Sequence, residues 1–269
     1  MEEVLKIYDA FGRIIIDKDL HTHTVYSHGK GSVLDNVKTA YDMGLKSIAI
    51  TDHGIDHFIY GVSRKNLVKE KEDVEKARVQ FPDMNILFGI ESDIKGLSGR
   101  IDLKKEDFEL FDIVLCGFHK PVWADKIGDY FKLFYNSYSH AVYKPTKGQI
   151  ARNTKAYINT IEKNPIDIIT HPNYHLKVNC YEVARACENN GAVLELSSRH
   201  QDLTEKDYED IFVKTNVMLA VNSDAHSLAN IGNAEKAKDV VKEYGVDPKR
   251  IVNTAGVGFR FRSGYTISY

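Results

Sequence analysis

Seven short apolar runs recur along the chain, each of strand length and rich in Ile, Val or Leu. They cover residues 13–20, 47–51, 86–90, 113–118, 166–170, 193–196 and 217–221. Continuous apolar runs of this length are typical of parallel strands that are buried on both faces, and helical patterns separate most of them. No Gly-rich phosphate loop follows the first run, which disfavours a Rossmann fold. The alternation predicts an α/β fold whose parallel strands close into a barrel.

One helix between these runs carries both a start and a stop signal. Ser32 followed by Asp35 is the pattern of a capping box, and Gly44 is a typical stop. The apolar face of this helix is predicted to consist of Val33, Val37, Ala40 and Tyr41. Two further helices are expected at 181–190, ended by Gly191, and at about 205–214, opened by Thr204.

The length of 269 residues suits one large domain. We therefore expect a single domain over residues 1–269, with an excursion at about 122–148 that is rich in Tyr, Phe, Lys and Ser. Long loops on barrels often shape substrate pockets, so we place this excursion on the catalytic face. The segment 94–102 contains two glycines and is expected to form a small hairpin or loop. The tail 259–269 is aromatic and basic, and the sequence assigns it no role.

The overall composition narrows the class of protein. The formal net charge is −2, which points neither to a nucleic-acid binder nor to a membrane-surface binder. No apolar run resembles a signal peptide or approaches the length of a membrane span, so we expect a cytoplasmic protein. Cys116, Cys180 and Cys187 form no CxxC pair and are interpreted as reduced, buried thiols. The oligomeric state is left open, and a homo-oligomer is compatible with the sequence.

Residues of the types that bind metal ions stand at or just past the ends of six of the seven runs. They are His21, His23, His53, Glu91, His119, His171, Asp224 and His226. Positions i and i+2 of an extended segment project from the same side, so His21 and His23 can present two nitrogens to one ion. A lone histidine is usually a surface residue or a hydrogen-bonded core residue. Its repetition at strand ends instead favours a metal cluster at one end of a barrel.

The sixth run ends differently, in Ser197-Ser198-Arg199-His200. Arg199 could bind a substrate phosphate as a planar fork, although a surface salt bridge explains an arginine equally well. Lys120 and His200 are similar candidates for substrate contact, with a solvated side chain as the alternative. No Ser/His/Asp or Cys/His arrangement stands out, so no protein nucleophile is assigned.

Six segments together resemble the motifs of a known family. DLHTHTVYSHGKGS, IAITDHG, GIESDI, CGFH, THP and NSDAH are similar, in order and spacing, to motifs of the PHP (polymerase and histidinol phosphatase) metallo-phosphoesterases. The resemblance spans about residues 15–230 and is strongest to stand-alone bacterial PHP phosphatases, including histidinol-phosphatase-like members. It implies a distorted (β/α)7, TIM-like barrel with metal ions at the C-terminal ends of the strands.

The resemblance further implies three metal sites. His21, His23 and Asp224 would hold the first ion, Glu91 would bridge to a second held by His119 and His171, and His28, His53 and His226 would hold a third. Imidazole and carboxylate ligands suit zinc, manganese or iron, so we expect three such ions per chain. Asp19 and Asp52 are expected to orient imidazoles from behind.

The implied activity is hydrolysis of a small phosphomonoester, with histidinol phosphate as one candidate. The ions would lower the pKa of a bridging water, and the hydroxide so formed would attack phosphorus. One alternative is a phosphodiesterase or exonuclease acting on nucleic acid, which the near-neutral charge disfavours. The other is a non-catalytic metal-binding barrel, which is disfavoured because all nine matched positions hold ligand-type residues.

Overall fold

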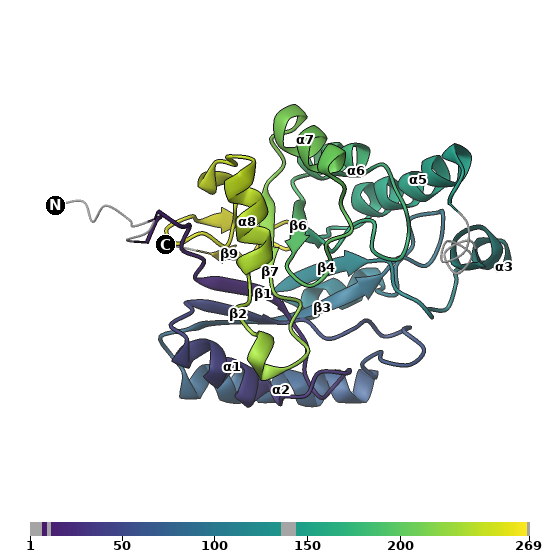
Figure 1. The fold of residues 1–269 in the computed structure, drawn as a ribbon. Coiled ribbons are helices and arrows are strands. Elements are labelled where there is room, and N and C mark those ends of the chain that lie inside the picture. Colours follow the sequence, from purple (N-terminus) through teal and green to yellow (C-terminus); the bar gives the residue numbers. More distant parts are fainter. Residues whose placement is uncertain (1–6, 10–11, 136–143, 268–269) are drawn as a thin grey trace.

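The computed structural model describes residues 7–9, 12–135 and 144–267. Seven parallel strands stand in chain order around a nearly closed barrel, and the helices cover its outside (Figure 1). The strands are β1 (Lys18–Thr22), β2 (Ser47–Ile50), β3 (Asn85–Asp93), β4 (Ile113–Gly117), β5 (Ile168–Ile169), β6 (Val193–Ser197) and β7 (Leu219–Asn222). The predicted (β/α)7 barrel is confirmed.

The barrel closes where β1 meets the chain that follows β7. The backbone N–H of His23 donates to the carbonyl of Ala225 at 2.9 Å, and the N–H of Ala225 donates to the carbonyl of His21 at 3.3 Å. The Asn222 side chain also accepts a hydrogen bond from the Leu20 N–H, at 3.1 Å. Closure therefore depends on the C-terminal ends of the two strands, where the candidate metal ligands stand.

The helices are α1 (Val33–Asp42), α2 (Arg64–Gln80), α3 (Ile127–Asp129), α5 (Lys147–Lys163), α6 (Cys180–Asn190), α7 (Glu205–Lys214) and α8 (Glu235–Glu243). In Figure 1, α1 and α2 cover the side of β1 to β3, whereas α5, α6 and α7 cover the side of β4 to β6. Among the described residues, no helix has the length and apolar character that crossing a membrane requires.

The predicted helix signals are confirmed at the caps. Ser32 and Asp35 form the capping box of α1, and α7 begins after the Thr204 cap and ends where predicted. One part of the prediction for α1 is wrong, because Tyr41 is 45% exposed. Asn36 is buried instead, and its side-chain amide donates to the carbonyl of His23 at 2.9 Å. A polar residue faces the barrel here because it tethers a backbone group of the candidate site.

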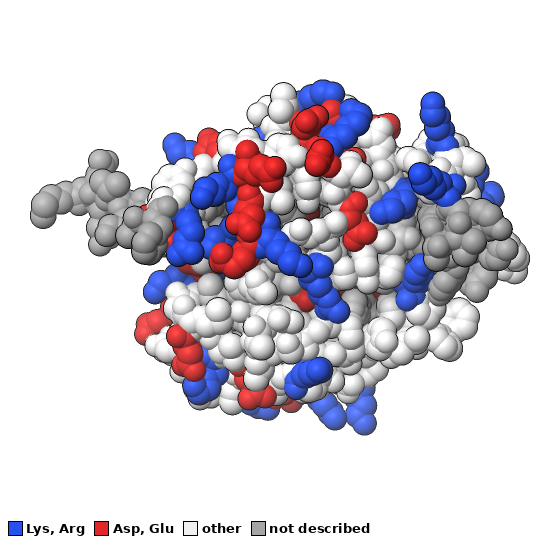
Figure 2. Space-filling view, viewed as in Figure 1, with Lys and Arg blue, Asp and Glu red and all other residues white. Residues whose placement is uncertain are grey.

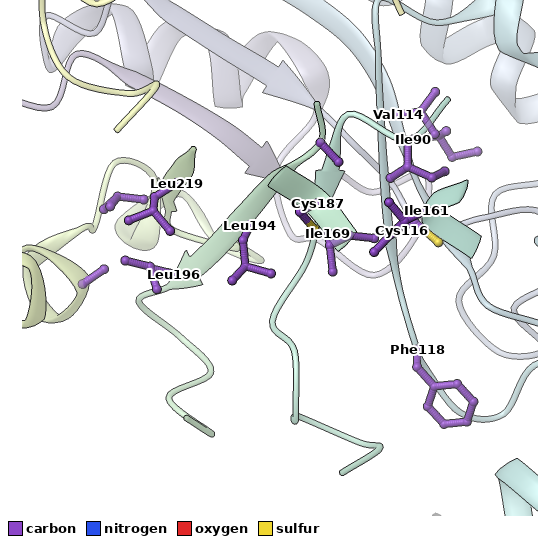
Figure 3. Close-up of a cluster of buried hydrophobic side chains, with 14 of the residues drawn as sticks. Ile90, Val114, Cys116, Phe118, Ile161, Ile169, Cys187, Leu194, Leu196 and Leu219 are labelled. Atoms are coloured by element: carbon purple, nitrogen blue, oxygen red, sulfur yellow. The ribbon is translucent and has the colours of Figure 1, made fainter. Parts of the chain in front are cut away.

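Side chains alternate between two apolar layers along each strand. In β4, Ile113 and Leu115 belong to the barrel interior, while Val114 and Cys116 belong to the outer layer beneath the helices. Figure 3 shows part of the outer layer, where strand residues lie beside Ile161 of α5 and Cys187 of α6. All three cysteines are buried free thiols, in agreement with their predicted place in the core.

Most strands differ from the predicted runs by one or two residues at an end, but two, β1 and β5, are much shorter. The first run begins at residue 13, yet β1 starts at Lys18, and before it Ile14 and Ile16 make only isolated antiparallel bridges. The fifth run was expected over 166–170, but β5 keeps two residues. Here the Asp167 carboxylate accepts a hydrogen bond from the Val114 N–H at 2.8 Å, so a side chain takes the place of a ladder carbonyl.

Two irregular segments lie between β3 and α5. The predicted hairpin at 94–102 is confirmed by a bridge between Ile94 and Ile101. The excursion at 122–148 contains α3 and a short π-helical turn, η2 (Tyr130–Tyr135). Its residues 136–143 lie outside the described residues.

The C-terminal tail closes the amino-terminal end of the barrel. It forms a hairpin of β8 (Phe259–Arg260) and β9 (Thr266–Ile267). Phe261 and Ile267 are 2% and 1% exposed and pack against the interior layer. Ser263 N–H donates to the Asp167 carboxylate at 2.8 Å, which fixes the hairpin beside the start of β5. The tail therefore has a structural role that the sequence did not indicate.

Replacing Phe261 with alanine should remove this plug from the barrel interior. We expect Phe261→Ala to lower the free energy of unfolding by about 3 kcal/mol, as large-to-small changes at buried aromatic positions do. Urea denaturation followed by circular dichroism would measure the loss. Phe58→Ala is a matched control, because Phe58 is 65% exposed and should lose less than about 1 kcal/mol. Equal losses in the two variants would contradict a structural role for the tail.

Candidate metal centre

The nine predicted ligands lie together at the C-terminal end of the barrel. Seven of them are buried, while His28 and His226 are half-buried. Strand β3 shows how the fold positions these ligands. Alternate residues of a strand face inward, so Leu87, Gly89 and Glu91 share one face. Leu87 lies in the apolar interior of the barrel, and Glu91 lies at its C-terminal end. A Cβ at the intervening Gly89 would lie 2.6 Å from a methyl group of Ile113, so only glycine fits there. The apolar layer thus ends directly beneath the polar cluster.

Glu91 occupies the centre of this cluster. Its Oε2 lies 3.4 Å from Nε2 of His21, 3.6 Å from Nε2 of His23 and 3.1 Å from Nδ1 of His53. Its Oε1 lies 3.4 Å from Nε2 of His119 and 2.9 Å from Nε2 of His171. One carboxylate thus faces two sets of imidazoles, with a different oxygen toward each set.

Buried carboxylates behind two histidines fix which ring nitrogen faces the centre. Nδ1–H of His21 donates to Glu195 at 2.8 Å, and Nδ1–H of His119 donates to Asp93 at 2.7 Å. Each ring then turns its Nε2 toward Glu91, which is the orientation of metal-binding histidines. His21 Nε2 lies 3.1 Å from His23 Nε2. Two nitrogens on one tetrahedral zinc ion would be roughly 3.3 Å apart.

Asp224 provides a second carboxylate on the opposite side of the centre. Its Oδ1 lies 3.4 Å from Nε2 of His23 and 3.3 Å from Nδ1 of His226, and its Oδ2 lies 3.2 Å from Nε2 of His200.

Two of the candidate ligands have a strained backbone. Asp224 and His171 have φ values of 51° and 23°, in the left-handed region that costs a non-glycine residue about 1–3 kcal/mol. Such strain is typical of functional positions, where the surrounding structure holds an unfavourable backbone in place.

His28, His53 and His226 form a third group at the mouth of the cluster. The ring centroid of His28 lies 4.0 Å from that of His226 and 4.8 Å from that of His53. Ligand atoms of His23, His53 and His226 all lie within 4.8 Å of one another. The loop that carries His28 packs tightly, because a Cβ at Gly29 would lie 2.3 Å from the His23 carbonyl oxygen.

The protonation states divide the histidines into two kinds. Burial lowers the pKa of His23 to about 3, and those of His28 and His226 to about 4, so these rings are neutral. Burial also tends to lower the pKa of His21 and His119. The negative charges of Glu91 and of the carboxylates behind the two rings outweigh this effect, so the pKa of both histidines is raised. Burial opposes the charged form of Glu91 too, yet the charges of His119 and His21 lower its pKa well below the usual range. A metal ion would therefore displace protons from His21 and His119.

Unpartnered atoms show that the donor set fits metal ions. Nδ1 of His53 and Oε2 of Glu91 face each other at 3.1 Å within the cluster, and neither has a hydrogen-bond partner among the described residues. Buried polar atoms rarely lack a partner, and each exception calls for a missing water or ion. Imidazole nitrogens and carboxylate oxygens are ligands for zinc, iron and manganese. Cations within the cluster would satisfy these atoms.

The two aspartates expected behind the imidazoles have different contacts. Asp19 accepts hydrogen bonds from Ser223 and, at 2.8 Å, from the Gly232 N–H, and none of its hydrogen bonds in the described chain goes to a histidine. Asp52 accepts from Thr24 N–H at 2.7 Å and lies 3.8 Å from Nδ1 of His23. Asp19 therefore fixes the residue that precedes Asp224, whereas Asp52 holds the chain that follows His23.

Glu195 and Asp93 are the orienting carboxylates that the sequence interpretation missed. Glu195 also accepts a hydrogen bond from the His171 N–H at 2.8 Å, so it holds two candidate ligands at once. The signal for Glu195 was an acidic residue within the apolar run of β6, and for Asp93 it was a second acid two positions after Glu91.

The three weaker candidates line a cavity of about 100 Å³ above the cluster. The Arg199 guanidinium lies 3.6 Å from Asp224 and contacts the His226 ring, and burial lowers the pKa of Lys120. His200 faces the carboxylate of Asp224. The cavity lining also includes residues that the sequence did not select, namely His57, Tyr60, Tyr174 and His175.

Comparison with known proteins identifies the family. The model of the PHP domain family matches residues 19–244. The chain belongs to the PHP domain family. The resemblance stated from its motifs is therefore confirmed, and the match spans every candidate ligand.

Relatives of this PHP domain bear phosphatase names. A "probable phosphatase" of Shewanella baltica is 30% identical over 251 residues, covering 87% of this chain and 85% of that protein. A "probable phosphatase" of a Thermoanaerobacter species is 30% identical over 250 residues, covering 88% and 89%. The crystal structure of histidinol phosphate phosphatase from Lactococcus lactis, complexed with zinc, L-histidinol and phosphate, has a TM-score of 0.62 at 16% identity, covering 94% and 99%. At that identity the structural match supports the fold alone.

A buried acid pair lies behind the PHP-domain centre. Glu70 of α2 is fully buried, and burial together with the charge of Asp52 raises its pKa well above the ordinary value of 4.5. Burial raises the pKa of Asp52 to about 6. The folded protein therefore holds a proton on Glu70 at a pH where the unfolded chain has released it.

Glu70→Gln should stabilise the protein as the pH rises. A raised folded-state pKa means that stability is complete below the unfolded value near 4.5 and is lost as pH rises through the folded pKa. The glutamine side chain does not titrate, so it adds no pH dependence to the stability. The melting temperature of Glu70→Gln should therefore exceed that of the wild type at pH 8, and the difference should vanish near pH 4.5. Thermal melts with chelator present would exclude metal effects. Glu72→Gln, exposed on the same helix, is the control; an equal pH-dependent gain there would refute the assignment.

Proposed function

We propose that this PHP-domain protein is a metal-dependent phosphatase that hydrolyses phosphomonoesters of small metabolites. The observation that carries the proposal is the position of Glu91, whose two oxygens face separate sets of imidazoles in a buried cluster. Family membership and the phosphatase names of the relatives support the same class of reaction. The hydrolysis of histidinol phosphate is one candidate activity, since the similar Lactococcus lactis structure is that of a histidinol phosphate phosphatase.

Three ions per chain fit the ligand-type residues of the cluster. His21, His23 and Asp224 would hold the first, with Glu91 shared with a second that His119 and His171 complete. His28, His53 and His226 would hold the third, although the ligand atoms that group with those of His53 and His226 are those of His23. Zinc, manganese and iron all suit these ligands. Zinc has direct precedent in the structure of the Lactococcus lactis protein.

The described residues divide the chemical work among them. Bound ions would lower the pKa of a water and neutralise charge on the phosphoryl oxygens. Glu195 and Asp93 hold the imidazoles of His21 and His119 in the tautomer that leaves Nε2 free. Arg199, at the mouth of the cavity, offers a planar fork of donors to phosphoryl oxygens, and Lys120 offers a second cation. No side chain is required as the nucleophile.

A nucleic-acid substrate is less well supported. A duplex or single strand is bound mainly through its phosphates, which requires a continuous basic track. In Figure 2, basic and acidic side chains are interspersed on the visible face, and an acidic stripe runs over α8 between basic groups. The cytoplasmic location and a homo-oligomeric assembly stay predictions.

Removal of the metal ions should abolish the activity. We expect dialysis against a chelator to end hydrolysis of p-nitrophenyl phosphate, and added zinc, manganese or iron to restore it. His21→Ala and Glu91→Gln should each lower kcat/KM by about a thousandfold or more, because each removes several kcal/mol of charge stabilisation. Glu109→Gln, exposed and remote from the cluster, should retain full activity. Turnover that survives both chelation and His21→Ala would exclude the proposed mechanism.

Metal analysis tests the third site separately. The purified, metal-loaded protein should contain three ions per chain by elemental analysis after gel filtration. His28→Ala should reduce this number to two, because its ring is the ligand nearest to His226 while the Glu91 contacts do not involve it. Three tightly held ions in His28→Ala would remove His28 from the ligand set.

A further inference from the structure

A second hollow opens from the mouth of the metal cluster and shares residues with it. Its volume is about 520 Å³, and His28, Arg199 and His226 line both spaces. The cavity above the cluster itself has only about 100 Å³, room for a few water-sized groups or one phosphoryl group. The organic part of a phosphomonoester would therefore extend beyond it, and the second hollow adjoins it at the three shared residues.

The lining of this second hollow is polar and basic. Besides the shared residues it consists of Lys30, Ser198, Ser223, Ser227, Asn230, Asn233 and Lys236. No carboxylate is among these described lining residues. The lining therefore combines cations with hydroxyl and amide donors, which are the groups that proteins use to bind phosphate and carboxylate.

The two lysines have charge available for a ligand. Glu235, next to Lys236, pairs with Lys238 at 2.8 Å, and Asp224 is the carboxylate that Arg199 approaches. The ion pairs among the described residues thus leave Lys30 and Lys236 uncompensated. Lys30 is also tied to the metal cluster, since its backbone N–H donates to the carbonyl of His226 at 3.0 Å.

We infer that the substrate carries a second anionic group, a phosphate or a carboxylate, which Lys30 and Lys236 bind in this hollow. The inference rests on the proposed phosphatase function and narrows its substrate class. A cationic leaving group such as histidinol, with an amine and an imidazole, would place like charges together here. A bisphosphorylated or phospho-carboxylate metabolite would instead have its second charge paired. Lys30 and Lys236 line the second hollow but not the cavity above the metal cluster, so they would determine specificity rather than chemistry.

Matched substrate pairs test the inference. The kcat/KM for fructose 1,6-bisphosphate would be compared with that for fructose 1-phosphate, and 3-phosphoglycerate with glycerol 3-phosphate. We expect the metal-loaded wild type to favour the member with the extra anion by about fivefold or more. The pair that shows the larger preference distinguishes a second phosphate from a carboxylate. The preference should weaken between 50 and 500 mM salt, because exposed charges are screened.

Variants assign the preference to the two lysines. Lys30→Gln with Lys236→Gln should reduce the preference about three- to tenfold, with the member that carries the extra anionic group losing more than its partner. Lys249→Gln is the matched control, since Lys249 is exposed beside the amino-terminal end of β7 and should leave the preference unchanged. This ratio is not altered by a uniform loss of folded enzyme.

Several outcomes would overturn the inference. They are a preference for histidinol phosphate over both substrates with a second anionic group, an undiminished preference in the double lysine variant, or faster cleavage of a single-stranded oligonucleotide than of any of the small substrates. Active hydrolysis of p-nitrophenyl phosphate alongside any of these results would leave the phosphatase function standing. Absence of turnover on every phosphomonoester would instead reject the phosphatase function, and the inference with it.

Discussion

The buried carboxylate of Glu91 is the interaction on which the rest of the centre depends. A carboxylate removed from water is strongly unfavourable unless cations or hydrogen-bond donors surround it. Five imidazole nitrogens lie within 3.6 Å of its oxygens, and they come from four different strand ends. The register of β3 places this group, because a slip of one residue would turn Glu91 outward and Ile90 or Ser92 inward. The barrel and the cluster therefore specify each other.

A second set of carboxylates decides what the imidazoles can do. Because Glu195 and Asp93 accept the Nδ1 protons of His21 and His119, Nε2 of both rings faces Glu91. The same carboxylates raise the pKa of these two histidines, which favours the protonated, positively charged form of both rings. Protons and metal ions therefore compete for one set of buried negative charges, and metal affinity in such a cluster must fall as the pH falls.

The sequence predicted those parts of the structure that follow from strand ends. Parallel strands bring all their carboxyl ends to one face, so ligand-type residues after separate apolar runs could be assigned to one centre without knowing any contact. The helix caps at Ser32 and Thr204 are local signals, so they too could be predicted from the sequence. Glu195 could not be placed, since the inward phase of a strand that is buried on both faces is fixed only by its neighbours in the barrel. The burial of Asn36 and the plug formed by Phe261 also depend on tertiary contacts that no local pattern encodes.

The two hollows separate chemistry from selectivity in physical terms. The metal cluster lies on strand ends whose inward positions are locked by the apolar layer beneath them, so a substitution there disturbs the packing of the barrel. The basic hollow is lined largely from the His28–Lys30 loop, the chain after β7 and the start of α8, where exposed side chains can change with little effect on stability. The hydrogen bond from the Lys30 N–H to the His226 carbonyl and the contact of Arg199 with His226 join the two regions. A barrel built this way can keep its phosphoryl-binding centre constant while surface residues determine which leaving group fits.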